Sequence, residues 1–87
     1  MQERVDRTEP VAVLGADGAL LARAVCRYTL ATDGWHGMLS DIRPAGVLQP
    51  GPYTLRFDDG RAVTVTISAF SPRDLRRAYF AGDAPPG

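Results

Sequence analysis

The sequence predicts a small all-β domain, in which about six mainly antiparallel strands close into a barrel or fold into a two-layer sandwich. The first supporting observation is a period-two alternation of apolar and polar residues, clearest between Gly51 and Phe70, which is typical of strands with one buried face. The second is an x-Asp-Gly turn that occurs three times between such runs and is typical of tight hairpins. Repeated hairpins favour an up-and-down meander over crossover connections, and a sheet of this size must close or fold to cover its apolar face.

Composition limits the functional classes. The 87 residues have an apolar fraction of 45%, which is typical of one globular domain. The formal net charge is zero, so the protein as a whole does not attract nucleic acid or acidic lipid electrostatically. All ten basic residues are arginines, an excess that we attribute to a bacterial-like compositional bias. Cys26 is the only cysteine, which excludes an intrachain disulfide, and no apolar run approaches the length of a membrane span. We therefore expect a cytoplasmic protein that does not enter a membrane.

A single domain is expected over residues 11–82. Residues 1–10 are mostly polar and carry charges of both signs, which predicts a flexible leader, and residues 83–87 are expected to form a flexible tail. The first two expected strands cover residues 11–14 and 19–30.

The first x-Asp-Gly turn lies between these two strands. A three-residue loop there sets Leu14 opposite Leu20 and Ala12 opposite Ala22. The second strand is longer than average, which predicts a bend or a bulge along it. Its apolar row is expected to face the core and consists of Leu20, Ala22, Ala24, Cys26, Tyr28 and Leu30.

The third expected strand, at residues 35–42, follows the second x-Asp-Gly turn and alternates poorly. This predicts a strand that is covered on both faces, in which Gly37 marks a bulge or the close approach of another backbone. One side of the strand is expected to carry Trp35, Gly37 and Leu39, and the other side His36, Met38, Ser40 and Ile42.

The central hairpin, at residues 51–70, follows a link rich in proline and glycine at residues 43–52. A three-residue Asp-Asp-Gly loop makes the apolar rows of its two strands coincide. Gly60 is then expected in the left-handed conformation at the last loop position. This register sets Leu55 opposite Val63 and Tyr53 opposite Val65.

The segment after Phe70 leaves two alternatives. The sequence Ser-Pro-Arg-Asp at residues 71–74 has the form of a helix start, and a short helix there would carry an apolar stripe. The favoured alternative is a single helical turn at residues 72–76, followed by a last strand at residues 77–81 that buries Ala78 and Phe80.

The sequence predicts neither a catalytic site nor a metal site. A three-residue turn sets Cys26 opposite Ser40, so that His36 lies too far along the strand for a thiolate–imidazole pair. His36 with Asp33 or Asp41 is too small a ligand set for a metal ion. Phosphate-binding glycine loops and nucleophile motifs are also missing. We therefore expect no enzymatic activity and no cofactor.

The function favoured by the sequence is protein–protein contact, as a homo-oligomeric building block or an accessory subunit of a larger assembly. The strand at residues 35–42 has more large apolar side chains than a small core needs, and aromatic and methionine residues are enriched at interface centres. An equally open alternative is that Trp35 caps one end of the barrel. The expected partner-binding residues are Trp35, Met38, Leu39, Arg73, Arg76 and Arg77.

The alternative function is binding of single-stranded nucleic acid by an arginine-rich face of a small barrel. Tyr53 and Phe57 belong to the apolar row of the central hairpin and are expected in the core, which disfavours them as stacking platforms. The residues that would bind nucleic acid are Arg23, Arg27, Arg56, Arg73, Arg76 and Arg77.

One short phrase resembles a known family. Residues 47–57 resemble the Leu-x-Pro-Gly-x-Tyr-x-Leu phrase of transthyretin-like and carboxypeptidase-regulatory β-sandwiches, through Leu48, Pro50, Gly51, Tyr53 and Leu55. The resemblance implies a turn that leads into an alternating strand. The rest of the chain does not follow that pattern, so the sequence assigns no family.

Overall fold

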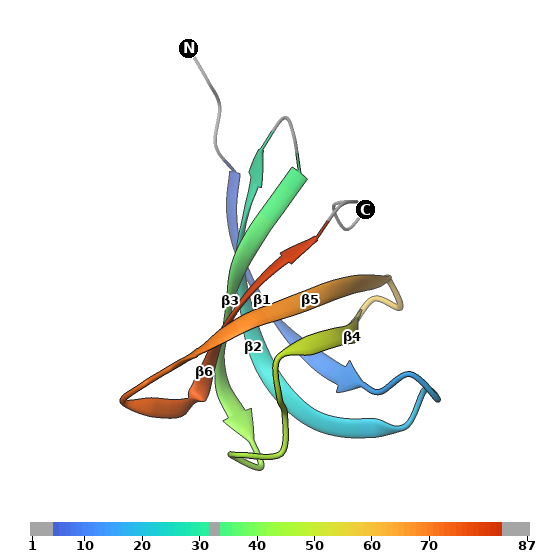
Figure 1. The fold of residues 1–87 in the computed structure, drawn as a ribbon. Helices are drawn as coiled ribbons and strands as arrows, with labels where there is room; N and C mark the ends of the chain where they lie inside the picture. Colours follow the sequence, from blue (N-terminus) through green and yellow to red (C-terminus); the bar gives the residue numbers. More distant parts are fainter. Residues whose placement is uncertain (1–4, 32–33, 83–87) are drawn as a thin grey trace.

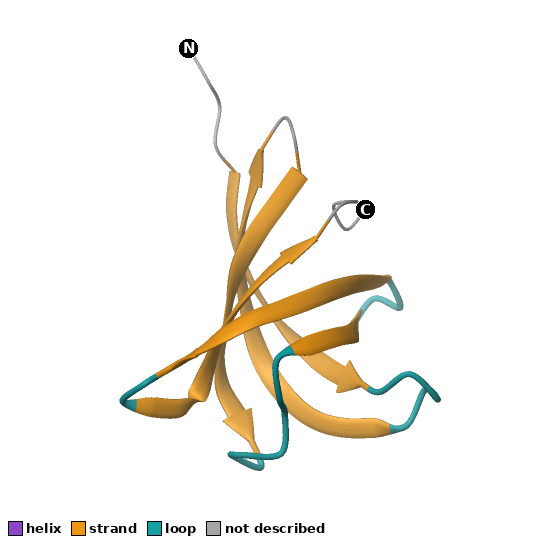
Figure 2. Cartoon of the chain, in the orientation of Figure 1, coloured by secondary structure: helices purple, strands orange, loops and turns teal. Residues whose placement is uncertain are grey.

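The computed structural model describes residues 5–31 and 34–82. These residues form six antiparallel strands that close into a barrel, and none of them lies in a helix (Figures 1 and 2). The strands are β1 (Val5–Leu14), β2 (Leu20–Ala31), β3 (Gly34–Arg43), β4 (Gly51–Phe57), β5 (Ala62–Ser71) and β6 (Asp74–Gly82). The predicted all-β fold is confirmed, and of the two predicted closures the chain adopts the barrel.

The barrel joins two three-stranded meanders. β1, β2 and β3 are neighbours in chain order, as are β4, β5 and β6, while β1 pairs with β4 and β3 pairs with β6. The prediction of one continuous meander is therefore wrong at the connection from β3 to β4. Residues 44–50 make this connection, and Leu48 from it is buried in the core. A hairpin turn specifies only the two strands that it joins, so the turns could not reveal how the two meanders meet.

The central hairpin has the predicted register, with Leu55 opposite Val63 and Tyr53 opposite Val65. The Gly60 N–H donates to the Phe57 carbonyl at 3.0 Å, and the Phe57 N–H donates to the Arg61 carbonyl at 2.8 Å. Gly60 has a φ of 94°, which a residue with a Cβ adopts only with strain. The predicted three-residue loop with glycine at its last position is confirmed.

The β1–β2 hairpin closes in the same way, and Leu14 lies opposite Leu20 as predicted. The predicted pairing of Ala12 with Ala22 is wrong, because β2 carries one extra residue at this point and Ala12 lies opposite Arg23. The bulge also changes which of two neighbouring leucines faces the core. Leu21 packs against the core, whereas Leu20, predicted to face it, is 51% exposed. A bulge can reverse the side-chain phase of a strand locally. The remaining described members of the apolar row are buried as expected: Ala22, Ala24, Cys26 and Tyr28.

β1 begins at Val5, so the predicted flexible leader over residues 1–10 is wrong for residues 5–10. Residues 1–4, and the predicted tail at residues 83–87, lie outside the described part of the chain. The strand was predicted only at residues 11–14, because its first half is polar: Arg7 and Thr8 are exposed, and Glu9 is only partly buried. Backbone pairing with β2 and the contacts of the Glu9 carboxylate with Tyr28 and Arg61 hold this segment in place.

The segment after β5 is a tight turn, and both helical alternatives for it are wrong. Pro72 and Arg73 form the turn, and β6 begins at Asp74. The Ser71 hydroxyl accepts the Arg73 N–H at 3.4 Å, and the Asp74 carboxylate accepts the Arg76 N–H at 3.0 Å. Serine and aspartate satisfy backbone donors in turns as they do at helix starts, which explains the error. The last strand buries Ala78 and Phe80 as predicted.

β3 pairs with β2 one residue away from the predicted register: Cys26 lies opposite Leu39, and Tyr28 opposite Gly37. The predicted three-residue turn at residues 32–34 includes residues 32–33, which lie outside the described part of the chain. Further along β3, Asp41 has a φ of 53° at a bulge. The bulge turns Ile42 into the core, although simple alternation predicted it on the side of Met38.

Four aromatic side chains cross the barrel interior in edge-to-face contacts. The ring centroids of Phe57 and Tyr28 are 6.0 Å apart, those of Tyr28 and Trp35 are 5.5 Å apart, and those of Trp35 and Phe80 are 5.0 Å apart. Trp35 is 3% exposed, although its indole Nε1 has no hydrogen-bond partner among the described residues. The aromatic rings therefore connect β2, β3, β4 and β6 through one continuous cluster.

We predict that Trp35→Ala lowers the free energy of unfolding by about 3–5 kcal/mol, the usual cost of truncating a buried aromatic side chain. Urea denaturation followed by circular dichroism measures this change. The matched control is His36→Ala, because His36 is the next residue of β3 and is exposed on the outside. The control is expected to change the free energy of unfolding by less than about 0.5 kcal/mol. Equal denaturation midpoints for the two variants would contradict the central role of Trp35.

Candidate partner-binding face

The three predicted contact residues of β3 do not share a surface. Trp35 and Leu39 are 3% and 0% exposed and lie inside the barrel, whereas Met38 lies on the outside and is half-buried. The prediction of an exposed Trp35–Met38–Leu39 patch is therefore corrected. Trp35 lies near the start of β3 and opposite Gly82 at the end of β6. This position agrees with the alternative prediction, in which Trp35 caps one end of the barrel.

The six arginines considered for nucleic-acid binding are exposed in the described structure, but they lie in three places. Arg23 and Arg56 lie on either side of Ala12, on β2 and β4. Arg27 lies further along β2, opposite Met38. The third group is at the β5–β6 turn and the start of β6, and consists of Arg73, Arg76 and Arg77.

Asp74 neutralises part of the third group. Its carboxylate lies 3.2 Å from Nε of Arg76 and 3.9 Å from Nε of Arg77. The backbone N–H of Arg76, followed by the Arg76 guanidinium, lowers the pKa of Asp74 below its ordinary value. Asp74 is therefore held as a carboxylate beside these two arginines.

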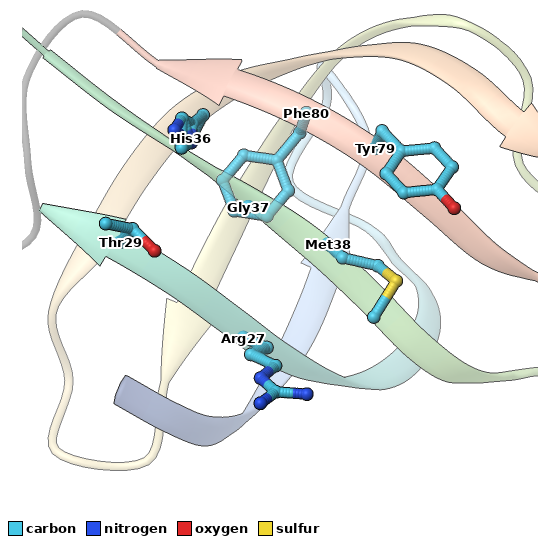
Figure 3. A pocket seen from close by; sticks show the side chains of 7 residues that line it. All are labelled: Arg27, Thr29, His36, Gly37, Met38, Tyr79 and Phe80. Carbon is cyan, nitrogen blue, oxygen red and sulfur yellow. The ribbon is translucent and has the colours of Figure 1, made fainter. Parts of the chain in front are cut away.

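A surface hollow of about 500 Å³ lies on the outer side of β2, β3 and β6. Two rows of paired residues border it: Arg27, Met38 and Tyr79 form one row across the three strands, and Thr29 and His36 belong to the other. Figure 3 shows Met38 and Tyr79 on one side of Gly37, and Thr29 and His36 on the other. We call this surface the hollow face; its described lining residues are Arg27, Thr29, His36, Gly37, Met38, Tyr79 and Phe80.

Tyr79 is the most exposed aromatic residue of the hollow face, at 45%. The sequence reasoning did not identify it as a site residue. The signal was nonetheless available: a last strand that buries Ala78 and Phe80 must point Tyr79 outward. A bulge in β5 lies opposite Tyr79, where Ser68 is the extra residue and its hydroxyl donates to the Tyr79 carbonyl at 3.3 Å. Bulges of this kind re-aim neighbouring side chains and are frequent beside functional sites.

Gly37 is one of the lining residues of the hollow face, and a side chain does not fit at this position. A Cβ at this position would lie 2.3 Å from the Arg27 carbonyl oxygen and 2.9 Å from both Tyr28 Cα and Phe80 Cζ. The predicted close approach of another backbone at Gly37 is confirmed. Gly37 lies opposite Phe80, and Gly82 lies opposite Trp35, so that each glycine of the β3–β6 pair faces an aromatic residue.

We predict that Gly37→Ala destabilises the barrel by about 1–3 kcal/mol, the usual cost of overpacking a filled interior. Two of the three close atoms belong to the β2 backbone and cannot rotate away. Thermal unfolding followed by circular dichroism measures the effect. Ser40→Ala, at a half-buried position of the same strand, is the control. An unchanged midpoint for Gly37→Ala would show that β2 and β3 separate easily.

A second cluster of polar side chains lies where β1 continues beyond the end of β4. The Arg61 guanidinium donates to the Glu9 carboxylate at 2.8 and 3.1 Å and to Asp59 at 2.6 Å, and it lies 4.8 Å over the Phe57 ring. The Tyr28 hydroxyl donates to the same Glu9 carboxylate. Burial, followed by Glu9, raises the pKa of Tyr28. These contacts tie β1 to β2 and to the start of β5.

Cys26 and His36 cannot act together. Cys26 is 0% exposed inside the barrel, whereas His36 is exposed on the outside. Burial, followed by the charge of Glu9, raises the pKa of the Cys26 thiol to about 12. A thiol that stays protonated at neutral pH is a poor nucleophile and a poor metal ligand.

We predict that native Cys26 reacts slowly with a thiol reagent at pH 8 and rapidly after unfolding in urea. The folded thiol ionises near pH 12 and the unfolded one near its ordinary value of 9.0, so the stability that comes from the neutral thiol decreases as the pH rises through this window. An absorbance assay with Ellman's reagent measures the rate. Thr66→Cys in a Cys26→Ala background is the exposed control. Equal rates for folded Cys26 and this control would contradict the buried position of the thiol.

Within residues 5–31 and 34–82, no group of three or more His, Cys, Asp or Glu residues is placed to hold a metal ion. No helix in the same residues is long and apolar enough to cross a membrane. No family model, no curated protein and no solved structure matches the chain.

Proposed function

We propose that this protein is a small non-enzymatic β-barrel module that works by protein–protein contact, as a subunit of a larger assembly, and that the hollow face is its contact surface. We further propose a cytoplasmic location, because the sequence has a single cysteine and so has no disulfide framework of the kind that small secreted domains use.

The observation that carries the proposal is the row of Arg27, Met38 and Tyr79 beside the hollow. These three side chains come from three different strands and are in register on the outer surface. Arginine, methionine and tyrosine are enriched at interface centres. Tyr79 and Met38 project from strands rather than loops, so little backbone conformational entropy is lost when a partner covers them.

The chemistry of the hollow face indicates what kind of partner it fits. Met38, Tyr79 and Phe80 supply an apolar lining, and Arg27 and His36 supply polar groups at its border. No acidic residue is among its described lining residues. A protein segment that inserts an apolar side chain and places a carboxylate beside Arg27 matches this arrangement, since guanidinium and carboxylate groups form strong paired hydrogen bonds.

The positions and contacts of the exposed arginines favour protein–protein contact over nucleic-acid binding. A single strand needs a continuous basic groove with exposed aromatic residues, whereas the arginines lie in three places and two of them contact Asp74. Binding of a single-stranded oligonucleotide that weakens steeply with added salt would favour the nucleic-acid alternative.

We predict that a photocrosslinking phenylalanine analogue at position 79 captures one discrete protein in an extract of the source cells. Capture is expected to be suppressed by excess unlabelled protein, but not by excess Arg27→Glu or Met38→Asp protein, because both variants alter the hollow face. Mass spectrometry of the crosslinked peptide is expected to show an apolar residue near an acidic one.

The matched control carries the same analogue at position 64. Thr64 is exposed on β5 and is paired with Thr54 of β4, on the strands farthest from β2 and β3 in the barrel order. Capture of the same protein from both positions, or competition by the two variants as strong as that by the unaltered protein, would overturn the proposal.

A further inference from the structure

The first half of β1 has a neighbouring strand on one side only. Residues Val5 to Pro10 pair with β2, whereas β4 pairs with β1 only from Val11 to Leu14. Figure 1 shows the N-terminal part of β1 running beside β2, away from β4. Among the described residues, the other side of this segment is therefore an open sheet edge, and such edges pair readily with a further strand.

The hydrogen bonds of the barrel determine which backbone groups face this edge. The Phe57 N–H donates to Arg61, on the β5 side. Backbone groups alternate along a strand, so those of Arg56 face β1. Arg56 lies opposite Ala12, and the backbone groups of Ala12 therefore face β4. Counting back in steps of two, the backbone groups of Asp6, Thr8 and Pro10 face the open edge.

Pro10 agrees with this assignment. Proline has no N–H and is tolerated in a sheet where the missing donor points off the edge. Pro52 of β4 follows the same rule, because it precedes the part of β4 that pairs with β1. The two prolines thus lie just outside the β1–β4 pairing, one on each strand.

We propose that two copies of this chain associate by antiparallel pairing of their β1 edges around Thr8. In this register Thr8 lies opposite Thr8, and their N–H and C=O groups bond reciprocally. The Asp6 N–H of each copy then faces the Pro10 carbonyl of the other, which needs no donor from the proline. The contact is the same for both copies, as a two-fold symmetric interface requires.

Charge selects this register over its neighbours. Pairing around Thr8 sets Arg7 of each copy opposite Glu9 of the other, and opposite charges on directly opposed residues are favourable. Pairing around Arg7 would set two arginines opposite each other, and pairing around Glu9 would set two glutamates opposite each other. Charged residues and proline usually protect an edge from indiscriminate pairing, and here they leave one self-complementary register.

Glu9 remains partly accessible for this contact. Its side chain is 30% exposed, and its carboxylate is held by Arg61 and Tyr28 of the same chain. Arg7 is exposed. The proposal does not rest on the hollow face, which lies on the outer surface of β2, β3 and β6 rather than at the edge of β1.

Sedimentation velocity at increasing concentration of the unaltered protein tests the proposal, and it is expected to show a monomer–dimer equilibrium. Thr8→Pro is expected to raise the dimer dissociation constant about tenfold or more, because one edge hydrogen bond is lost from each copy. The N–H of Thr8 faces away from β2, so the barrel is expected to stay folded by circular dichroism. Thr8→Ala keeps the N–H and is expected to dimerise normally.

The register has its own test. With Cys26 replaced by alanine, Thr8→Cys is expected to form a covalent dimer on mild oxidation, because directly opposed strand residues lie within disulfide range. Arg7→Cys is the control and is expected to crosslink far less. Tyr79→Ala is expected to leave the dimer intact, which separates this proposal from the proposed function.

Three outcomes would overturn the proposal: a monomer at every concentration, a dimer that Thr8→Pro leaves unchanged, or equal crosslinking at positions 7 and 8. A chain that stays monomeric but whose β1 amides become protected from hydrogen exchange by an extended peptide would assign the edge to a different partner, and would also overturn it.

Discussion

The contact between aromatic rings and glycines across β3 and β6 is the constraint on which the rest of the barrel depends. Trp35 lies opposite Gly82, and Phe80 opposite Gly37, so that each large ring occupies space that the opposite residue leaves free. A Cβ at Gly82 would lie 2.3 Å from Nε1 of Trp35. The β3–β6 pair is one of the two places where the meanders meet, and edge-to-face contacts continue from it through Tyr28 to Phe57 on the opposite meander. Each such aromatic contact contributes about 0.5–1.5 kcal/mol beyond the apolar area that it buries.

The second junction between the meanders is much shorter. β1 and β4 pair over four residues each, between Pro10 on one strand and Pro52 on the other. Beyond this junction, the Glu9–Arg61 contact and the ring of Phe57 under Arg61 hold β1 near the start of β5. The barrel is thus closed by backbone pairing on one side and by a charged contact beyond it, which leaves the first half of β1 as an open edge.

The candidate site could be predicted only in part. Met38 was identified from the sequence, and Arg27 was identified as an exposed arginine, but their proximity to Tyr79 depends on β6 lying beside β3. No local pattern specifies that neighbour, because the chain reaches β6 only after the turns of a separate meander. Trp35 and Leu39 were misplaced for a related reason: a poorly alternating strand does not show which of its faces the other meander covers.

The sequence by itself determined the all-β class, the Asp-Gly loops of the β1–β2 and β4–β5 hairpins, and most of the apolar rows of β2, β4 and β5. These features depend on neighbours within one hairpin, where glycine conformation and period-two alternation act locally. The sequence also predicted a bend or a bulge in β2, but only the tertiary structure decided where the bulges lie, at Leu21, Asp41 and Ser68. It also decided the β3–β6 and β1–β4 pairings and the strand character of residues 5–10. Each of these depends on contacts between residues far apart in the chain, whose geometry is set when the two meanders close around a shared aromatic core.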